Sequence, residues 1–145
     1  MPTAMSEPSS SHLHELDREL CDERLGSHHI GRVAWNAPDG PMVLPVTYAF
    51  YNGEVVFRTS PFGPLSPLTK PTNVAFEIDE IDEDAGTGWS VVVRGRAEAV
   101  VRAYDLASVW SLDGLVPWAP GTRNLIIAIT PRKVTGRAVK APFAD

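Results

Sequence analysis

The sequence is poor in cysteine, in long apolar runs and in clustered basic residues. Its one cysteine, Cys21, excludes a disulfide framework and a metal site built from several cysteines. The longest apolar run, residues 125–129, is far too short to cross a membrane. No run of lysine or arginine forms a basic stripe on this chain of net charge −5, so nucleic acid is not expected as a partner.

The composition is that of one folded domain. The chain has 145 residues, of which 43% are hydrophobic and 21% charged, which is ordinary for a globular domain and too apolar for a disordered chain. Residues 1–12 are polar and rich in serine and proline, without the apolar core of a secretion signal. We therefore expect a disordered tail over residues 1–12, a single domain over residues 13–145 and a cytoplasmic location.

The pattern of apolar residues predicts one helix followed by many strands. Leucines and Cys21 recur at helical spacing between Leu13 and Leu25, which predicts one amphipathic helix that ends near Gly26. Beyond it, Asn52-Gly53 between two apolar runs is the strongest short signal for a β-hairpin. The predicted strands are residues 30–35, 42–51, 54–60, 73–79, 89–101, 125–130 and 133–139.

The segments between these strands support the same reading. Residues 61–71 hold four prolines and predict a loop with one short helical turn, residues 80–88 an acidic surface loop, and residues 104–112 a short helix. Gly95 interrupts a long strand and predicts a bend or bulge there. About seven strands without a βα rhythm exclude a Rossmann-type sheet and favour a mainly β, antiparallel barrel with a few short helices.

Several segments, taken in order, resemble one known family. They are Leu44-Pro45-Val46-Thr47-Tyr48, Val55-Val56-Phe57-Arg58-Thr59-Ser60, Val74-Ala75-Phe76-Glu77-Ile78-Asp79 and the run from Gly88 to Glu98. Their order and spacing resemble the actinobacterial branch of the pyridoxamine 5′-phosphate oxidase-like family, whose members are FMN-binding split β-barrels. The resemblance extends from Leu16 to about Val139. It implies a split barrel, a homodimer with the cofactor between the subunits, and a small-molecule substrate.

The resemblance also implies an activity. It predicts an FMN-dependent oxidoreductase in which the flavin performs the redox chemistry and the protein binds and orients it, so no side chain is named as catalytic. Pyridoxamine 5′-phosphate oxidase activity itself is not expected, because the chain is short and lacks that enzyme's arginine- and histidine-bearing motif after Val139. The alternatives are a non-catalytic carrier of a flavin, a deazaflavin or haem on the same barrel, and a structural domain without a cofactor.

The end of the third predicted strand carries the candidate phosphate site. Arg58 and Ser60 share one face of that strand because side chains alternate, and arginine presents a planar fork of donors that suits phosphate. The resemblance assigns Arg58, Thr59 and Ser60 to the cofactor phosphate. Without the resemblance, an ion pair of Arg58 with Glu77 or Asp79 on a neighbouring strand is the favoured explanation of the charge, and the resemblance reverses that preference.

The loop after this strand departs from the family pattern. Many relatives carry a Gly-Thr-Lys-Leu run whose lysine lies near the cofactor phosphate, whereas this chain reads Phe62-Gly63-Pro64-Leu65-Ser66. The resemblance still places Gly63, Leu65 and Ser66 at the cofactor. The lysine is missing, and Lys70 follows several residues later. We therefore expect FMN to bind more weakly here than in relatives that keep the lysine.

The other candidate cofactor residues come from the resemblance alone. It places Pro45, Val46, Thr47 and Tyr48 against the isoalloxazine ring, Trp89 and Ser90 near the flavin, and Trp118 and Arg123 in a segment reaching over from the partner subunit. Ordinary roles are also open to them. Val46 and Tyr48 suit a hairpin core, Trp89 suits apolar packing and Trp118 suits a loop anchor. The proline at position 45 belongs at a strand edge or bulge, because it removes a ladder donor.

Three further patterns are explained by ordinary structural roles. Trp89, Val91, Val93, Gly95 and Ala97 share an apolar strand face that we expect in the core or at a dimer interface, which supports the predicted homodimer. His28 and His29 are adjacent and match no zinc spacing, so we expect exposed or hydrogen-bonded histidines. The acidic run over residues 79–84 lacks the pattern of a calcium loop. No metal site is predicted.

Overall fold

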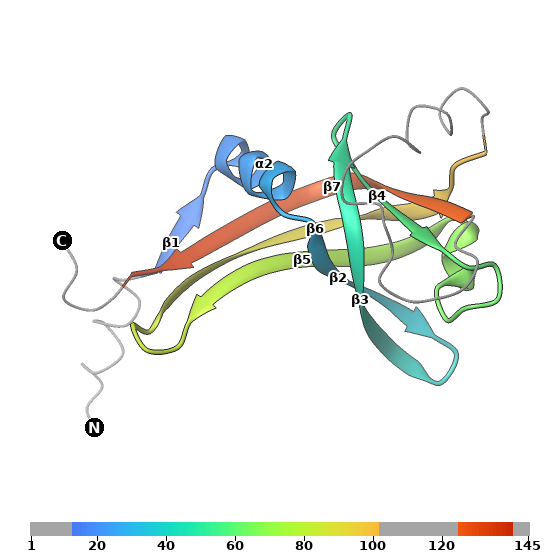
Figure 1. The fold of residues 1–145 in the computed structure, drawn as a ribbon, viewed down its shortest axis with the longest axis horizontal. Coiled ribbons are helices and arrows are strands. Elements are labelled where there is room, and N and C mark those ends of the chain that lie inside the picture. The colour runs from blue at the N-terminus through green and yellow to red at the C-terminus, as the bar shows by residue number, and fades with distance from the viewer. Residues whose placement is uncertain (1–12, 102–124, 141–145) are drawn as a thin grey trace.

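The computed structural model describes residues 13–101 and 125–140, and this part is almost entirely β-structure (Figure 1). Its elements are β1 (Leu13–Leu16), α2 (Arg18–Ser27), β2 (Ile30–Ala37), β3 (Gly40–Tyr51), β4 (Glu54–Thr59), the 3₁₀-helix η2 (Ser66–Thr69), β5 (Thr72–Asp82), β6 (Thr87–Ala99) and β7 (Leu125–Val139). Every strand pairing is antiparallel, as predicted. Neither helix described is long and apolar enough to span a bilayer.

The strands close into a barrel at β7. The sheet order is β1-β7-β4-β3-β2-β5-β6, and β6 pairs again with β7. On its other side β7 has two neighbours in succession. Residues 125–129 pair with β4, and residues 136–139 pair with β1. The predicted antiparallel barrel is therefore confirmed, with β7 as the strand that completes it.

The helix is shorter than predicted, because its first two leucines lie in a strand. Leu13–Leu16 is β1, which pairs with the end of β7, and the prediction of one helix from Leu13 is wrong. The helix begins at Arg18 because Asp17 is its N-cap, with extended backbone and a side chain that accepts a hydrogen bond from the Leu20 amide at 2.9 Å. Residues before an N-cap are outside the helix.

Two predicted backbone features are confirmed. Asn52 and Gly53 both have positive φ, 51° and 77°, which is the geometry of a type I′ hairpin turn. The pairing of β6 with β7 shifts register between Arg94 and Gly95, so the predicted bulge is present. A Cβ on Gly95 would lie 2.3 Å from the Thr130 carbonyl oxygen, so only glycine permits this close approach of the two backbones.

Two strand boundaries differ from the prediction. β5 continues to Asp82 and β6 begins at Thr87, so most of the predicted acidic loop is strand. β7 is one strand and not two, because Pro131 lies opposite Gly95 at the bulge, where the ladder is already irregular and a missing N–H costs little. The predicted helix at residues 104–112 lies outside the described residues.

The barrel interior is an apolar core built around three aromatic rings. Tyr48, Phe57 and Phe76 are fully buried, and Tyr48 meets Phe76 edge to face with ring centroids 4.8 Å apart. The Tyr48 hydroxyl donates to the Leu25 carbonyl oxygen of α2 at 2.8 Å, and burial raises the pKa of Tyr48, which keeps the donor protonated. This bond joins the C-terminal turn of the helix to the core.

The apolar face of β6 lies inside this core. Val91, Val93 and Ala97 are fully buried within one chain and contribute to the main core cluster. The alternative that this face is covered by a second subunit is therefore wrong. A dimer of this protein needs a different surface.

Replacing Tyr48 with phenylalanine tests the tie between helix and core. Tyr48→Phe leaves the buried Leu25 carbonyl without its donor, which should lower the free energy of unfolding by about 1–2 kcal/mol. Urea denaturation measures it. Tyr51→Phe, at a partly exposed position of the same strand, is the matched control and should change stability by less than about 0.5 kcal/mol. Equal effects of the two variants would contradict the role of this bond.

Candidate functional site

The ladder between β3 and β4 opens partway along both strands, and the place where it ends is called the opening. Their ladder runs from the hairpin at Asn52-Gly53 and ends at the pair Tyr48 and Phe57. Beyond it β3 continues beside β2, and β4 continues beside β7, with which it already pairs from Val55 onward (Figure 1). The stretch Pro45–Thr47 and the end of β4 thus lie on the two sides of this opening. Two of the predicted groups of cofactor residues are brought together here.

The end of β4 carries a buried hydroxyl without a partner. Thr59 is 1% exposed, and its Oγ1 has no hydrogen-bond partner within the described residues. Beside it, Ser60 Oγ accepts a bond from the Phe62 amide at 3.2 Å, which leaves the serine hydrogen free to donate. Arg58 is partly exposed on the other face of the strand. A buried hydroxyl normally has a partner, so the Thr59 hydroxyl is a candidate for binding a ligand oxygen.

The loop after β4 is held by its own bonds and by two buried leucines. Gly63 accepts a bond from the Ser66 amide at 3.0 Å, and Ser66 begins η2. Leu65 and Leu68 are buried in the main core. The predicted helical turn in this loop is therefore confirmed. Of its candidate residues, Leu65 acts in packing, whereas Gly63 and Ser66 are partly exposed.

The β3 stretch presents alternating faces at the opening. Val46 and Tyr48 point into the core, as the hairpin-core reading predicted, while Pro45 is exposed and Thr47 is partly exposed. Pro45 pairs with Arg32 of β2, and β4 does not pair with this part of β3. The predicted edge position of Pro45 is confirmed.

The proposed ion pair of Arg58 with the acids of β5 is not formed. Glu77 and Asp79 bind Arg32 of β2, at 2.6 and 2.9 Å from its Nη2. β4 has β3 and β7 as neighbours and does not adjoin β5. Burial raises the pKa of Glu77, and the bond with Arg32 opposes that shift. The predicted pairing of Arg58 with these two acids is therefore wrong.

Trp89 and Ser90 lie at the other end of the barrel. Trp89 is opposite Ala138 of β7, whereas Arg58 is opposite Ile126 of the same strand. The twelve residues between these positions correspond to about 40 Å of strand. One chain therefore does not bring the two groups of predicted residues together.

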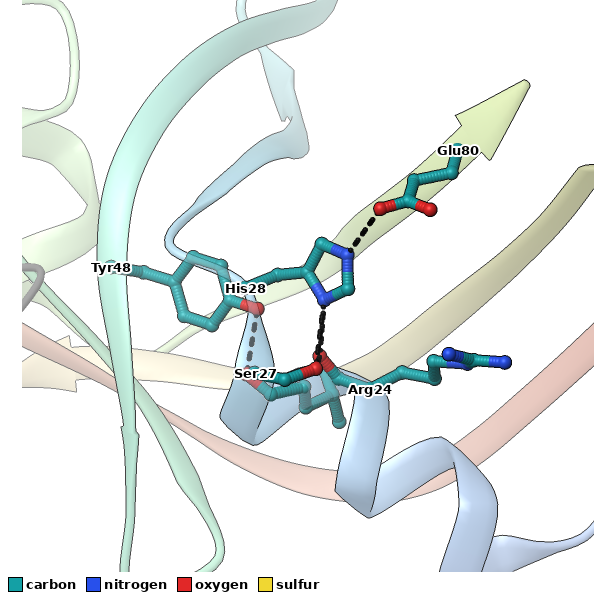
Figure 2. A network of polar contacts seen from close by, with 6 residues as sticks. Arg24, Ser27, His28, Tyr48 and Glu80 are labelled. Atoms are coloured by element: carbon teal, nitrogen blue, oxygen red, sulfur yellow. Dashed lines mark hydrogen bonds and ion pairs between the residues drawn. The ribbon is translucent and has the colours of Figure 1, made fainter. Parts of the chain in front are cut away.

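Trp89 packs against a polar network around His28 that the sequence did not predict, and Figure 2 shows the hydrogen bonds of His28 in it. The Arg24 guanidinium lies over the Trp89 ring at 4.9 Å, and His28 meets that ring edge to face at 5.0 Å. His28 Nε2 is 3.0 Å from a Glu80 carboxylate oxygen, and its Nδ1 is 2.8 Å from the Arg24 carbonyl oxygen. The bond with His28 lowers the pKa of Glu80. Trp89 therefore has the predicted packing role. The network that it contacts connects α2, β5 and β6.

Two of the remaining predictions cannot be placed. Trp118 and Arg123 lie outside the described residues. His28 is hydrogen-bonded and His29 is exposed, in agreement with the prediction for both. Within residues 13–101 and 125–140, no group of three His, Cys, Asp or Glu side chains could hold a metal ion.

Comparison with known proteins finds a matching family model, a related protein and similar solved structures. The family model described as "Pyridoxamine 5'-phosphate oxidase" matches residues 17–138. The uncharacterized protein Rv0080 of Mycobacterium tuberculosis is 33% identical over 141 residues, which cover 94% of this chain and 91% of that protein. A solved structure titled as the FAD binding protein from Mycobacterium smegmatis has a TM-score of 0.74 at 30% identity, covering 88% of this chain and 99% of that one.

A more distant solved structure shares the fold. The FAD and heme binding protein from Mycobacterium smegmatis has a TM-score of 0.70 at 15% identity, covering 92% of this chain and 76% of that one. At that identity the similarity shows the barrel alone.

The unpartnered Thr59 hydroxyl gives a prediction for the ligand-free protein. Thr59→Val removes a buried polar group that has no partner among the described residues, so the free energy of unfolding should rise by about 1 kcal/mol. Thr87→Val, at a partly exposed threonine, is the control and should stay within about 0.5 kcal/mol. Thermal or urea unfolding without added ligand measures both. A destabilised Thr59→Val would mean that the hydroxyl has a partner after all.

Proposed function

Because the chain belongs to the pyridoxamine 5′-phosphate oxidase family, we propose that it binds a flavin, FMN, at the opening between β3 and β4 and acts as an oxidoreductase on a small molecule. The single observation that carries this proposal is the unpartnered Thr59 hydroxyl beside Arg58. Arg58 and Thr59 point to opposite faces of β4, so a phosphate that used both the guanidinium and the hydroxyl would lie at the end of the strand. The substrate stays unassigned.

Different residues at the opening would bind different parts of the cofactor. Arg58, Thr59 and Ser60 would hold the phosphate, and the edge of β3 at Pro45 and Thr47 would take the polar rim of the ring through backbone groups. Val46 and Tyr48 fix that edge from inside the core. A bound flavin would supply the redox chemistry. The protein's part is to bind, orient and exclude water.

The site is proposed to be completed by a second copy of the chain. Trp89 and Ser90 belong to the predicted site but lie about 40 Å of strand from Arg58. In a two-fold dimer the same surface serves both copies, so the Ser90 region of one subunit can cover the opening of the other. The need to complete the flavin site is therefore the reason to propose a homodimer, because the apolar face of β6 is already buried within one chain.

FAD is the competing flavin. The M. smegmatis relative at 30% identity is named for FAD, and FAD shares with FMN the ring and the first phosphate. Arg58 and Thr59 suit that shared phosphate in either compound. Riboflavin, which lacks it, is therefore the ligand that tests the site.

Arg58→Ala should weaken FMN binding by about 10- to 150-fold, the equivalent of about 1.5–3 kcal/mol for one charge-assisted contact. Riboflavin affinity should change little, and Arg96→Ala, an exposed arginine on the outer face of β6, should leave both unchanged. Fluorescence titration measures all of these. Unchanged FMN affinity would show that Arg58 has a structural role only.

Mixing two defective variants tests the composite site. Arg58→Ala disables one half, and Ser90→Asp places a negative charge on the outward face of β6 in the other half. If each site draws one half from each subunit, co-expression should restore about one quarter of the wild-type flavin sites. Flavin content per chain and light scattering measure the sites and the dimer. A stable monomer, or no recovery on mixing, would contradict the proposal.

The missing lysine can be restored. Pro64→Lys should tighten FMN binding about two- to fivefold at low salt, because it adds a cation and an N–H near a dianionic phosphate. The gain should shrink as salt screens the exposed charge over about 10 Å at 0.1 M. Pro38→Lys, in the exposed turn between β2 and β3, is the matched control. No gain at low salt would mean that the present loop already satisfies the phosphate.

A further inference from the structure

A groove with three cations lies on the outer face of β6 and β7. It has a volume of about 410 Å³, within the range of small-molecule pockets. Helix α2 lies on the opposite, inner face of these strands (Figure 1). The residues of the groove that matter here are Ser90, Val92, Arg94, Lys133, Thr135 and Arg137.

The register places these residues in three successive cross-strand pairs. Ser90 is opposite Arg137, Val92 is opposite Thr135, and Arg94 is opposite Lys133. Because strand side chains alternate with a period of two, all six point to the same face. Arg94 and Lys133 are like charges directly opposite each other, an arrangement that destabilises a sheet.

The three cations have no partner within the described chain. Arg94, Lys133 and Arg137 are exposed, and none makes an ion pair or side-chain hydrogen bond in residues 13–101 or 125–140. The groove contains one carboxylate, Glu15, whose backbone is opposite Arg137 but which forms no ion pair there. On a chain of net charge −5, this is a local excess of positive charge.

The acids of the neighbouring strand β5 bind another residue. Glu77 and Asp79 lie on β5 beside Val92 and Ser90, but both bind Arg32. Arg94 therefore forms no ion pair with these acids across the sheet. The fold therefore places the like-charged pair Arg94 and Lys133 in a groove, while the two β5 carboxylates beside it bind Arg32.

We propose that this groove binds the phosphate group of a small molecule. Two guanidinium groups and an ammonium group face one space, and the hydroxyls of Ser90 and Thr135 add donors that can rotate toward an anion. A phosphate has enough oxygens and charge to use cations from both strands. Its binding would remove the repulsion between Arg94 and Lys133.

The phosphate has two possible sources. Ser90 is in the groove and is also proposed to cover the flavin of the other subunit, so the anion is either the flavin's own phosphate or that of a separate phosphorylated compound. Only the first source rests on the proposed function. The affinity of the groove for inorganic phosphate is independent of it.

The test compares two double variants of equal charge. The groove variant carries Arg94→Gln and Lys133→Gln, and the control carries Arg96→Gln and Lys140→Gln, both at exposed positions that do not line the groove. Calorimetric titration with inorganic phosphate, FMN and riboflavin gives the affinities. Melting without ligand checks folding. The groove variant should melt no lower than wild type, because it loses a like-charge pair.

We expect phosphate affinity to fall at least tenfold in the groove variant and less than twofold in the control. If FMN affinity falls with it while riboflavin affinity is kept, the flavin phosphate is the ligand. If FMN affinity is unchanged, a separate phosphorylated compound is. A wild-type chain that binds phosphate but no flavin refutes the proposed function alone. No phosphate binding by wild type, or equal losses in both variants, overturns the groove proposal.

Discussion

The pairing of β7 holds the molecule together and fixes where its sites lie. β7 adjoins β6 along nearly its whole length, and on its other edge it adjoins β4 first and β1 last. β4 pairs with β7 from Val55 to Thr59 but with β3 only as far as Phe57, so Arg58 and Thr59 lie beyond the end of the β3 ladder. The pairing of β6 with β7 places Trp89 near the far end of β7, away from Arg58.

Most of the fold could be predicted because its signals are local. The Asn52-Gly53 turn needs positive φ at two residues, and the bulge at Gly95 needs a residue without a Cβ, so both are visible in the sequence. The start of the helix, wrongly predicted at Leu13, could also have been found locally, because Asp17 is a favourable N-cap residue. The single long β7 could not be predicted, because Pro131 is tolerated only through its position opposite Gly95.

The candidate site also has a part that the sequence could predict and a part that it could not. Arg58, Thr59 and Ser60 are adjacent in sequence, so a strand end with suitable chemistry could be found from the residues and the family resemblance. That Thr59 is buried without a partner could not, because it depends on how β4 leaves β3. The contacts of Trp89 with Arg24 and His28 join segments more than sixty residues apart. No residue spacing in the sequence predicts such long-range contacts.

The charge distribution follows from strand register in a way that composition hides. The net charge of −5 argues against anion binding by the chain as a whole. Register nevertheless sets Arg94 opposite Lys133 and gives Glu77 and Asp79 to Arg32. Moving β7 by one residue against β6 would turn its cations to the other face, because side chains alternate. The bulge at Gly95 fixes that register. One glycine thus both permits the close approach of β6 to β7 and keeps the cations of the two strands on a common face, which is why a locally basic groove can exist on an acidic protein.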